Sequence, residues 1–258
     1  MNLLETTNVS IRFGGVQALD SVDFSVNEHE IVGLIGPNGA GKTTFFNCAT
    51  GFYRPDTGSI RYRGEDITDL RPDERTHLGI ARTFQQVGLV RSFSVLENLI
   101  VAQHQKVAYT AGAGMFGAPW TFTEEAKLRA RALEILDFLG LIQYADSPLA
   151  GMPYGLLKLC ETAAVLATDP DVLMLDEPLA GLSPEEGAAF GDRLLEMRRE
   201  LGLTVILVDH HVPLVLRVAD FVYVLNFGRI LASGSPEEVR GNRDVAEAYM
   251  GKGAEALA

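Results

Sequence analysis

The sequence predicts an α/β protein whose core is a mostly parallel β-sheet. Three observations support this: short apolar segments typical of buried strands, helix-start patterns that alternate with them, and a glycine-rich turn between one such strand and a helix. Alternating strands and helices favour a parallel sheet. The chain has 258 residues, of which 47% are hydrophobic, so it can bury a sizeable core in one or two domains.

The first part of the chain predicts strands, one tight turn and a helix. Val22, Phe24 and Val26 alternate with polar residues, which indicates a strand with one buried face. The apolar run 31–35 ends at glycines and indicates a strand buried on both faces. We expect a helix over residues 42–50.

The middle of the chain carries helical patterns and little sign of strands. Ser94 to Glu97 matches a capping box at a helix start, and leucines among charges over 123–139 predict an amphipathic helix. The Gly- and Ala-rich segment 111–119 is expected to be a loop. We therefore expect a core lobe, residues 1–87 and 166–258, with an inserted helical subdomain, residues 88–165.

Strands and helices alternate again toward the C-terminus. Apolar segments predict strands at 172–175, 205–208, 221–225 and 229–232. Ser183 and Ser235 are each followed by Pro-Glu-Glu, which predicts a capped helix start at both places.

Charge and cysteine content limit the classes of function. The net charge is −12, which disfavours a protein that coats nucleic acid. Cys48 and Cys160 lie outside any metal-binding spacing and are expected to be reduced, buried thiols. No apolar run is long enough to span a bilayer, and no signal-peptide pattern is present, so we expect any membrane role to be indirect.

The strongest chemical signal is a phosphate-loop motif, which follows a predicted strand and opens a predicted helix. It reads Gly36-Pro37-Asn38-Gly39-Ala40-Gly41-Lys42-Thr43 and fits G-x-x-x-x-G-K-[ST]. Glycines let backbone N–H groups surround an anion, and the helix N-terminus adds partial positive charge. We expect Lys42 to reach the β- and γ-phosphates of ATP, Thr43 to ligate Mg²⁺, and Thr44 to support the α-phosphate. The alternative is a tight glycine turn with a surface lysine.

Two adjacent carboxylates, Asp176 and Glu177, follow the predicted strand 172–175. Ligands of open α/β sheets bind at this end of the strands. We expect Asp176 to face Mg²⁺, directly or through water, and Glu177 to act as the general base on the attacking water. The alternative is a pair of solvated acids at a strand end.

His210 lies just past the predicted strand 205–208. A histidine at this position can hydrogen-bond a γ-phosphate and the attacking water. The alternative is a structural or solvated side chain, and without the other motifs His210 would carry no functional assignment. We expect its neighbour His211 to start the next helix.

With these motifs, the chain resembles the ATP-binding subunits of ABC transporters over essentially its full length. It is most similar to the ATPases of importers for branched-chain amino acids and related amides. The resemblance also rests on four further segments, Val9–Leu19, Arg82–Gln85, Gly228–Val239 and Ala246–Gly251. It implies an ABC-type P-loop ATPase with a mostly parallel core, N-terminal antiparallel strands and an inserted helical subdomain.

The resemblance also implies roles for individual residues. Phe13 matches the aromatic residue that stacks on adenine, and His210 matches the switch histidine. Gln85 matches the glutamine that senses Mg²⁺ and the γ-phosphate and hinges the helical subdomain, although a plain polar strand end is the alternative. The segment 88–99 is expected near the docking surface for a membrane subunit.

The sequence departs from the family at its signature motif, Leu-Ser-Gly-Gly-Gln, which binds the partner's nucleotide. The corresponding residues are Met152 to Leu156, of which only Gly155 is kept. Pro153 has neither a hydroxyl nor an N–H to donate. Because one charge-assisted hydrogen bond to phosphate is lost, we predict a normal site of its own and a partner site slower by about 10- to 100-fold if the loss falls wholly on the transition state. The N–H of Gly155 and a helix start expected at Leu157 would offset part of this loss.

As a function, the resemblance implies ATP hydrolysis that powers import through transmembrane permeases, at the cytoplasmic face of the inner (plasma) membrane. The implied partners are a second ATPase, identical or different, the permeases and, indirectly, an extracytoplasmic solute-binding protein, but no nucleic acid. Branched-chain amino acids are the default solute, with urea, amides and aromatic acids open.

Three alternatives stay open at this point. A soluble ABC-type ATPase acting on nucleic acid or ribosomes is disfavoured by the acidic charge. A weakly hydrolysing regulatory subunit would explain the altered signature, but the acidic pair and His210 are intact. An exporter ATPase is disfavoured because no membrane domain is fused to the chain.

Overall fold

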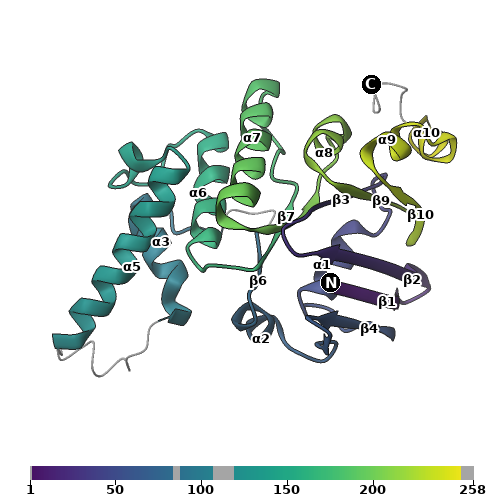
Figure 1. Cartoon of the computed structure of the whole chain (residues 1–258), viewed down its shortest axis with the longest axis horizontal. Helices are drawn as coiled ribbons and strands as arrows, with labels where there is room; N and C mark the ends of the chain where they lie inside the picture. The colour runs from purple at the N-terminus through teal and green to yellow at the C-terminus, as the bar shows by residue number, and fades with distance from the viewer. Residues whose placement is uncertain (1, 84–87, 107–118, 251–258) are drawn as a thin grey trace. The chain divides into compact units, whose positions relative to one another are not determined.

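The computed structural model describes residues 2–83, 88–106 and 119–250, and it divides the chain into two compact units (Figure 1). The first unit comprises residues 1–85 and 171–258, and the second comprises residues 86–170. The predicted helical insertion, residues 88–165, lies a few residues inside the limits of the second unit.

A six-stranded sheet forms the centre of the first unit. Its strand order is β10-β9-β3-β8-β7-β6, and every neighbouring pair is parallel except β10 with β9. The α/β class with a mostly parallel sheet is thereby confirmed. The strands are β3 (Ile31–Ile35), β6 (Ile80–Arg82), β7 (Val172–Asp176), β8 (Thr204–Val208), β9 (Phe221–Asn226) and β10 (Arg229–Gly234).

The strand register brings three chain segments to one edge of this sheet. Leu34 pairs with Val208, and Val208 pairs with Asp176. The residues that follow β3, β7 and β8 therefore leave the sheet side by side. These residues begin the glycine loop, the acidic pair and the histidine turn.

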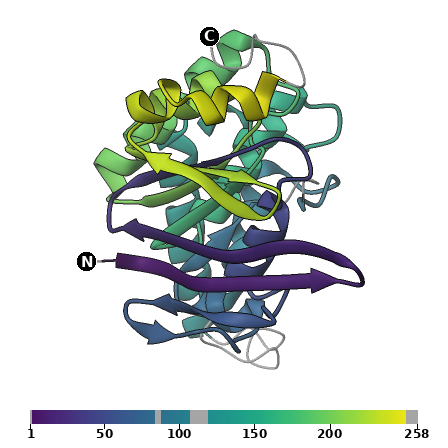
Figure 2. The same ribbon diagram turned by 90° about the vertical axis from the view of Figure 1, so that its right-hand side faces the viewer.

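A second sheet consists of antiparallel strands from the N-terminal part of the chain, as predicted. Its order is β2-β1-β4-β5. Figure 2 shows β1 and β2 as two long neighbouring strands. The alternating segment 22–26 lies within β2. The strands are β1 (Asn2–Phe13), β2 (Val16–Asn27), β4 (Thr57–Tyr62) and β5 (Glu65–Asp66).

The helices of the first unit begin largely where the sequence patterns predict. Ser183 and Ser235 cap their helices through complete capping boxes, and His211 is the N-cap of α8. The helices are α1 (Lys42–Ala49), α2 (Pro72–His77), α7 (Pro184–Leu201), α8 (Val212–Val218), α9 (Pro236–Arg240) and α10 (Arg243–Met250).

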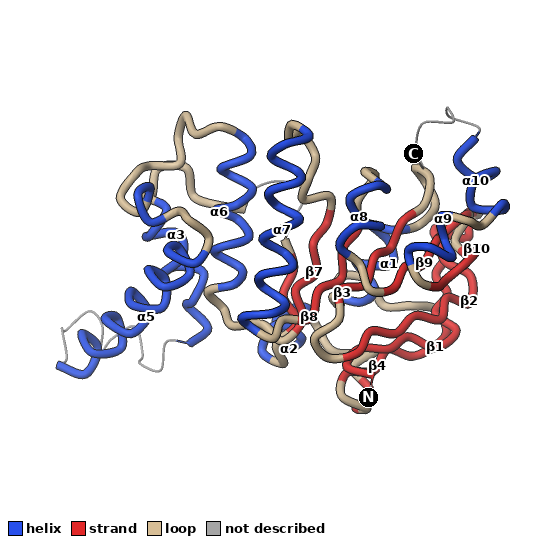
Figure 3. The backbone as a smooth tube through the Cα atoms, turned by 45° about the horizontal axis from the view of Figure 1, so that its top comes forward, coloured by secondary structure: helices blue, strands red, loops and turns tan. Residues whose placement is uncertain are grey.

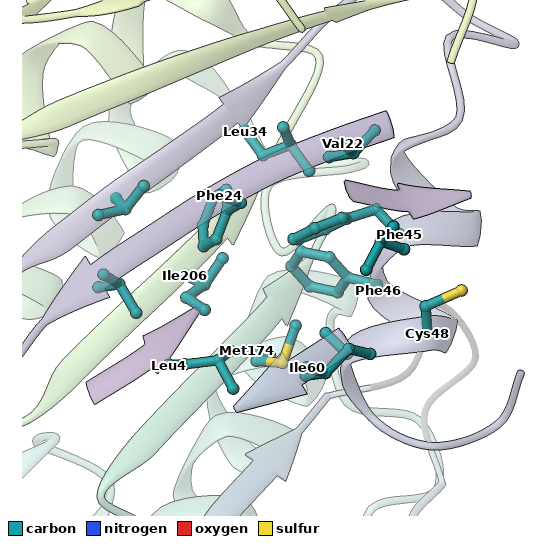
Figure 4. Close-up of a cluster of buried hydrophobic side chains, with 14 of the residues drawn as sticks. Leu4, Val22, Phe24, Leu34, Phe45, Phe46, Cys48, Ile60, Met174 and Ile206 are labelled. Carbon is teal, nitrogen blue, oxygen red and sulfur yellow. The ribbon is translucent and has the colours of Figure 1, made fainter. Parts of the chain in front are cut away.

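The hydrophobic core holds α1 among strands of both sheets (Figure 4). Phe45 and Phe46 of α1 are buried, and the ring of Phe24 from β2 lies 4.8 Å from that of Phe45. Met174 and Ile206 contribute to the same cluster from the parallel sheet. Because the glycine loop leads directly into α1, this packing fixes the end of the loop.

Both cysteines are free and buried, as expected. Burial raises the pKa of the Cys48 thiol and of the Cys160 thiol to about 12. Cys48 lies on α1 and Cys160 on α6.

The second unit is helical in its described part (Figure 3). It contains α3 (Val95–Ala102), the 3₁₀ turns η1 (Gln103–Lys106) and η2 (Ile142–Tyr144), α5 (Pro119–Phe138) and α6 (Tyr154–Leu166). Gln103 donates to the carbonyls of Leu99 and Leu128, which ties α3 to α5. The capping box at Ser94 is confirmed.

Two boundaries in the second unit differ from the prediction. Helix α6 begins at Tyr154 with Pro153 as its N-cap, so the predicted start at Leu157 is wrong by almost one turn. Helix α5 already includes Pro119, and the rest of the predicted loop lies outside the described residues. Across the part of the chain that is described, every helix is too short or too polar to cross a membrane.

Candidate nucleotide-binding site

The glycine loop between β3 and α1 has no room for a side chain at two of its positions. Gly36 and Gly41 adopt φ angles of 154° and 109°. A Cβ at Gly36 would lie 2.0 Å from the Leu225 carbonyl oxygen, and one at Gly41 would lie 2.6 Å from that of Ala18. The sheet therefore approaches the loop so closely that glycine is required at both positions.

The Lys42 side chain lies over this loop. It is only 7% exposed, and its Nζ donates to the carbonyl oxygens of Gly36 at 2.7 Å and Pro37 at 3.1 Å. A buried ammonium surrounded by loop backbone is a site for an anion of high charge.

A pocket of about 380 Å³ opens beside the loop. Glu177 lines it together with seven predicted site residues of the phosphate loop and the start of α1, namely Asn38, Gly39, Ala40, Gly41, Lys42, Thr43 and Thr44. Val16, Gln17 and Ala18 of β2 complete the wall, and sequence reasoning missed them. In the sequence, Gly14-Gly15 marks the turn that precedes β2. Only the fold shows that the start of β2 lies beside the glycine loop.

The two adjacent carboxylates lie in different surroundings. Asp176 is fully buried, and its Oδ2 pairs with the guanidinium of Arg82 at 2.5 Å. Glu177 is half-buried and lines the pocket. Its φ angle of 49° is unusual for a residue with a side chain, and its N–H donates to Val208 at 2.8 Å. This bend sends the chain out of β7 and separates the two acids.

Arg82 is the residue that fixes Asp176, and sequence reasoning gave it no role of its own. It also donates to the Asn47 side chain at 2.6 Å and lies 5.4 Å from the centre of the Phe46 ring. Both of those residues belong to α1, so the ion pair connects the acidic strand end to the helix that follows the loop.

The oxygens available near the loop fit Mg²⁺. Oδ1 of Asp176 is buried and has no hydrogen-bond partner among the residues that the structure describes. The Thr43 side chain belongs to the pocket wall. Mg²⁺ prefers oxygen ligands and takes few from the protein, because waters and substrate phosphates supply the rest. No cluster of three or more metal-binding side chains occurs among the described residues.

His210 borders the phosphate loop from another side. Its side chain is 59% exposed, and its Nδ1 lies 3.6 Å from Oδ1 of Asp209. A second pocket, of about 460 Å³, is lined by His210, the start of the loop, the β9–β10 turn and α10. The loop contributes Gly36, Pro37 and Asn38, the turn Asn226 and Phe227, and α10 Glu247, Ala248 and Tyr249.

The remaining predicted site residues are Phe13, Gln85 and Gly155. Phe13 ends β1, is 45% exposed, and packs edge-on against Tyr53 with ring centres 5.1 Å apart. Gln85 lies outside the described residues. Gly155 is buried in the first turn of α6, in the second unit.

Taken together, the fold and the site define a class of protein. A phosphate-binding loop leads into a buried helix, and a carboxylate from the same edge of the sheet lines the same pocket. This combination is that of a P-loop nucleoside triphosphatase.

Comparison with known proteins narrows the class. The family model described as "ABC transporter" matches residues 19–180, and the model described as "Branched-chain amino acid ATP-binding cassette transporter" matches residues 229–255. The high-affinity branched-chain amino acid transport ATP-binding protein LivG of Salmonella typhimurium is 41% identical over 97% of this chain and 98% of its own.

Solved structures of ABC transporter cassettes share the fold of this chain. An ATP-binding cassette of an ABC transporter in its ADP conformation matches with a TM-score of 0.86 at 34% identity, over 98% of this chain and all of its own. A dimeric bacterial ABC transporter cassette matches with a TM-score of 0.74 at 25% identity, over 90% of this chain and 98% of its own.

The chain belongs to the family of ATP-binding subunits of ABC transporters, which couple ATP hydrolysis to transport. Such subunits work as dimers with transmembrane partners and are associated with membranes. The soluble, non-transport alternative is accordingly disfavoured.

Proposed function

We propose that this chain hydrolyses ATP to power the uptake of branched-chain amino acids, or of related amino acids and amides, through partner permeases. One observation carries the proposal: the residues 38–44 of the phosphate loop and Glu177 face one pocket. The solute class is supported by the LivG relative and by the C-terminal match over 229–255.

The phosphate loop holds the triphosphate. Backbone N–H groups of Asn38, Gly39, Ala40 and Gly41 surround it, and the helix start at Lys42 adds partial positive charge. Phosphate oxygens take the place of the two loop carbonyls as acceptors for the Lys42 ammonium, which then contacts the β- and γ-phosphates. Thr44 supports the α-phosphate, and the exposed ring of Phe13 stacks on adenine.

Thr43 and Asp176 would hold Mg²⁺ through their side-chain oxygens. The family resemblance adds Gln85 as a third residue that would contact the ion. When bound, Mg²⁺ neutralises charge that develops on the phosphates. Arg82 keeps the Asp176 carboxylate in one orientation, because it is paired with Oδ2 and leaves Oδ1 as the available oxygen.

Glu177 is the general base. Its side chain lines the pocket that holds the phosphates, so it can accept a proton from water that attacks the γ-phosphate. His210 borders the loop at residues 36–38 and donates a hydrogen bond to the γ-phosphate. The two groups approach from different sheet strands, which lets both act on one phosphate.

The working state is a dimer with a second ATPase, identical or different. Gly155 contributes a backbone N–H toward the partner's nucleotide. Pro153 contributes neither a hydroxyl nor an N–H, so the partner's site is expected to turn over about 10- to 100-fold more slowly. Permeases bind at the cytoplasmic face of the membrane, and an extracytoplasmic solute-binding protein delivers the solute.

Co-purification tests this assembly. The tagged chain is purified from detergent-solubilised membranes in the presence of Mg-ATP, and the recovered proteins are identified. The expected result is a multi-span permease and an ATPase partner. Recovery of ribosomal proteins, or of no membrane protein at all, would contradict the proposal. A parallel purification of the Lys42→Ala variant identifies the partners whose recovery depends on nucleotide.

The solute is tested by uptake. Membrane vesicles that contain the recovered complex and its binding protein are supplied with labelled leucine, urea or phenylalanine. ATP-dependent accumulation of leucine supports the proposed class, whereas accumulation of urea or phenylalanine alone assigns a different solute.

A further inference from the structure

Asp209 is a buried carboxylate between β8 and the histidine turn, and its sequence pattern gave no sign of a role. The side chain is 0% exposed. Its Oδ2 accepts the N–H of Leu179 at 3.1 Å, and its Oδ1 accepts the N–H of His211 at 2.8 Å. The same Oδ1 lies 3.6 Å from Nδ1 of His210.

These contacts join two segments that are distant in sequence. One is the loop 177–183, which begins at Glu177 and is closed by hydrogen bonds from Ala180 to Glu177 at 3.2 Å and from Leu182 to Leu179 at 3.0 Å. The other is the turn 209–211. The loop is held to the end of β8 at two points. The N–H of Glu177 donates to the Val208 carbonyl at 2.8 Å, and the N–H of Leu179 donates to the Asp209 carboxylate.

The arrangement requires an acceptor on both sides of the residue. A carboxylate accepts through both oxygens, whereas an asparagine amide presents an oxygen on one side and an NH₂ donor on the other. In either orientation, the amide of an Asn at position 209 would place its NH₂ against a backbone N–H, that of Leu179 or that of His211. A buried donor without an acceptor is unfavourable, so the substitution is expected to release one of the two segments.

The His210 ring lies beside the same carboxylate, but Nδ1 is 3.6 Å from Oδ1, beyond hydrogen-bond distance. Asp209 therefore holds His210 through the backbone of the turn, by accepting the N–H of His211. With Nδ1 on the Asp209 side, Nε2 is the ring nitrogen that is left for a ligand. His210 and loop residues from Leu179 to Ser183 also border a common pocket of about 360 Å³. A displacement of the loop is therefore transmitted to the surroundings of His210 through Asp209.

We propose that Asp209 is a positioning residue that holds the Glu177 loop and His210 in one fixed relation, so that the base and the histidine meet the γ-phosphate together. This inference rests on the proposed function, because it assigns Glu177 and His210 to the same reaction. Asp209 itself contacts no reacting atom. Its effect should appear in the rate of hydrolysis and not in the affinity for ATP, since the phosphate loop is held by other contacts.

The test compares Asp209→Asn with Asp209→Glu and with the control Asp192→Asn, each in the complex that co-purifies with the chain. Asp192 is an exposed aspartate of α7 that pairs with Arg217 at 3.4 Å, so its loss should change nothing in the site. For Asp209→Asn we expect kcat to fall by at least about tenfold, because small misplacements of catalytic groups have large effects on rate. The KM for ATP and the Kd of a fluorescent ATP analogue should stay close to the wild-type values, whereas Tm should fall by a few degrees because one buried hydrogen bond is lost.

Asp209→Glu keeps both acceptor oxygens and should recover part of the lost kcat. The inference is overturned if Asp209→Asn hydrolyses ATP at the wild-type rate. It is also overturned if ATP affinity falls together with kcat, because that pattern indicates a general loss of structure around the nucleotide. A wild-type complex that binds but does not hydrolyse Mg-ATP would instead overturn the proposed function, and the inference with it.

Discussion

Removal of the Arg82 guanidinium tests how the acidic strand end is built. In Arg82→Met, the fully buried Asp176 loses the cation that lies 2.5 Å away, while methionine retains most of the apolar contact with Phe46. Removing one partner of a buried ion pair costs about 3–5 kcal/mol, since the other charge is left buried and uncompensated. For a chain of this size, each kcal/mol corresponds to about 2–4 °C in Tm, so Tm should fall by about 6–20 °C.

Thermal unfolding followed by circular dichroism measures this effect. The matched control is Arg54→Met, which removes an exposed ion pair with Asp69 and should change stability by less than about 1 kcal/mol. The double variant Arg82→Met with Asp176→Asn removes the buried charge as well and should recover part of the loss. A Tm for Arg82→Met as high as that of the control would refute the claim that Asp176 depends on Arg82.

Three further predictions concern the loop, the adenine contact and the thiols. Lys42→Ala should weaken ATP binding by about 10- to 150-fold, the equivalent of a charge-assisted hydrogen bond of about 1.5–3 kcal/mol, and an unchanged Kd in a fluorescent-ATP titration would contradict it. Phe13→Ala should weaken ATP binding by about 2- to 13-fold, because stacking contributes about 0.5–1.5 kcal/mol, and Phe13→Tyr should weaken it by less. Equal Kd values for both variants and the wild type would exclude stacking. Burial raises the pKa of Cys48 and Cys160 to about 12, so both thiols stay protonated at pH 8. They should therefore react with iodoacetamide only after unfolding. Rapid labelling of the native chain would contradict this prediction.

The features that sequence predicted well are those encoded by neighbouring residues. The phosphate loop, its preceding strand and its helix form one continuous segment, so residue spacing alone places them. The capping boxes at Ser94, Ser183 and Ser235 are equally local, because each one is a contact between residues three apart. The parallel sheet followed from the alternation of such segments.

The features that sequence did not predict depend on pairing between distant segments. Arg82 and Asp176 are 94 residues apart, and only the β6–β7 register places them together. Asp209 binds Leu179 across 30 residues for the same reason. Helix α6 starts before the predicted Leu157, so that Gly155 falls in its first turn. A glycine is tolerated there, since N–H groups of the first turn need no intrahelical partner.

The most direct test of the account is ATP hydrolysis by Glu177→Gln beside the wild-type chain, with ATP binding measured on the same preparations. Glutamine keeps the size of the side chain but cannot accept the proton of the attacking water. We predict an ATP Kd close to that of the wild type and a hydrolysis rate lower by about 10²- to 10⁴-fold. Hydrolysis by Glu177→Gln at the wild-type rate would contradict the assignment of this residue as the base, and with it the mechanism built on the shared pocket.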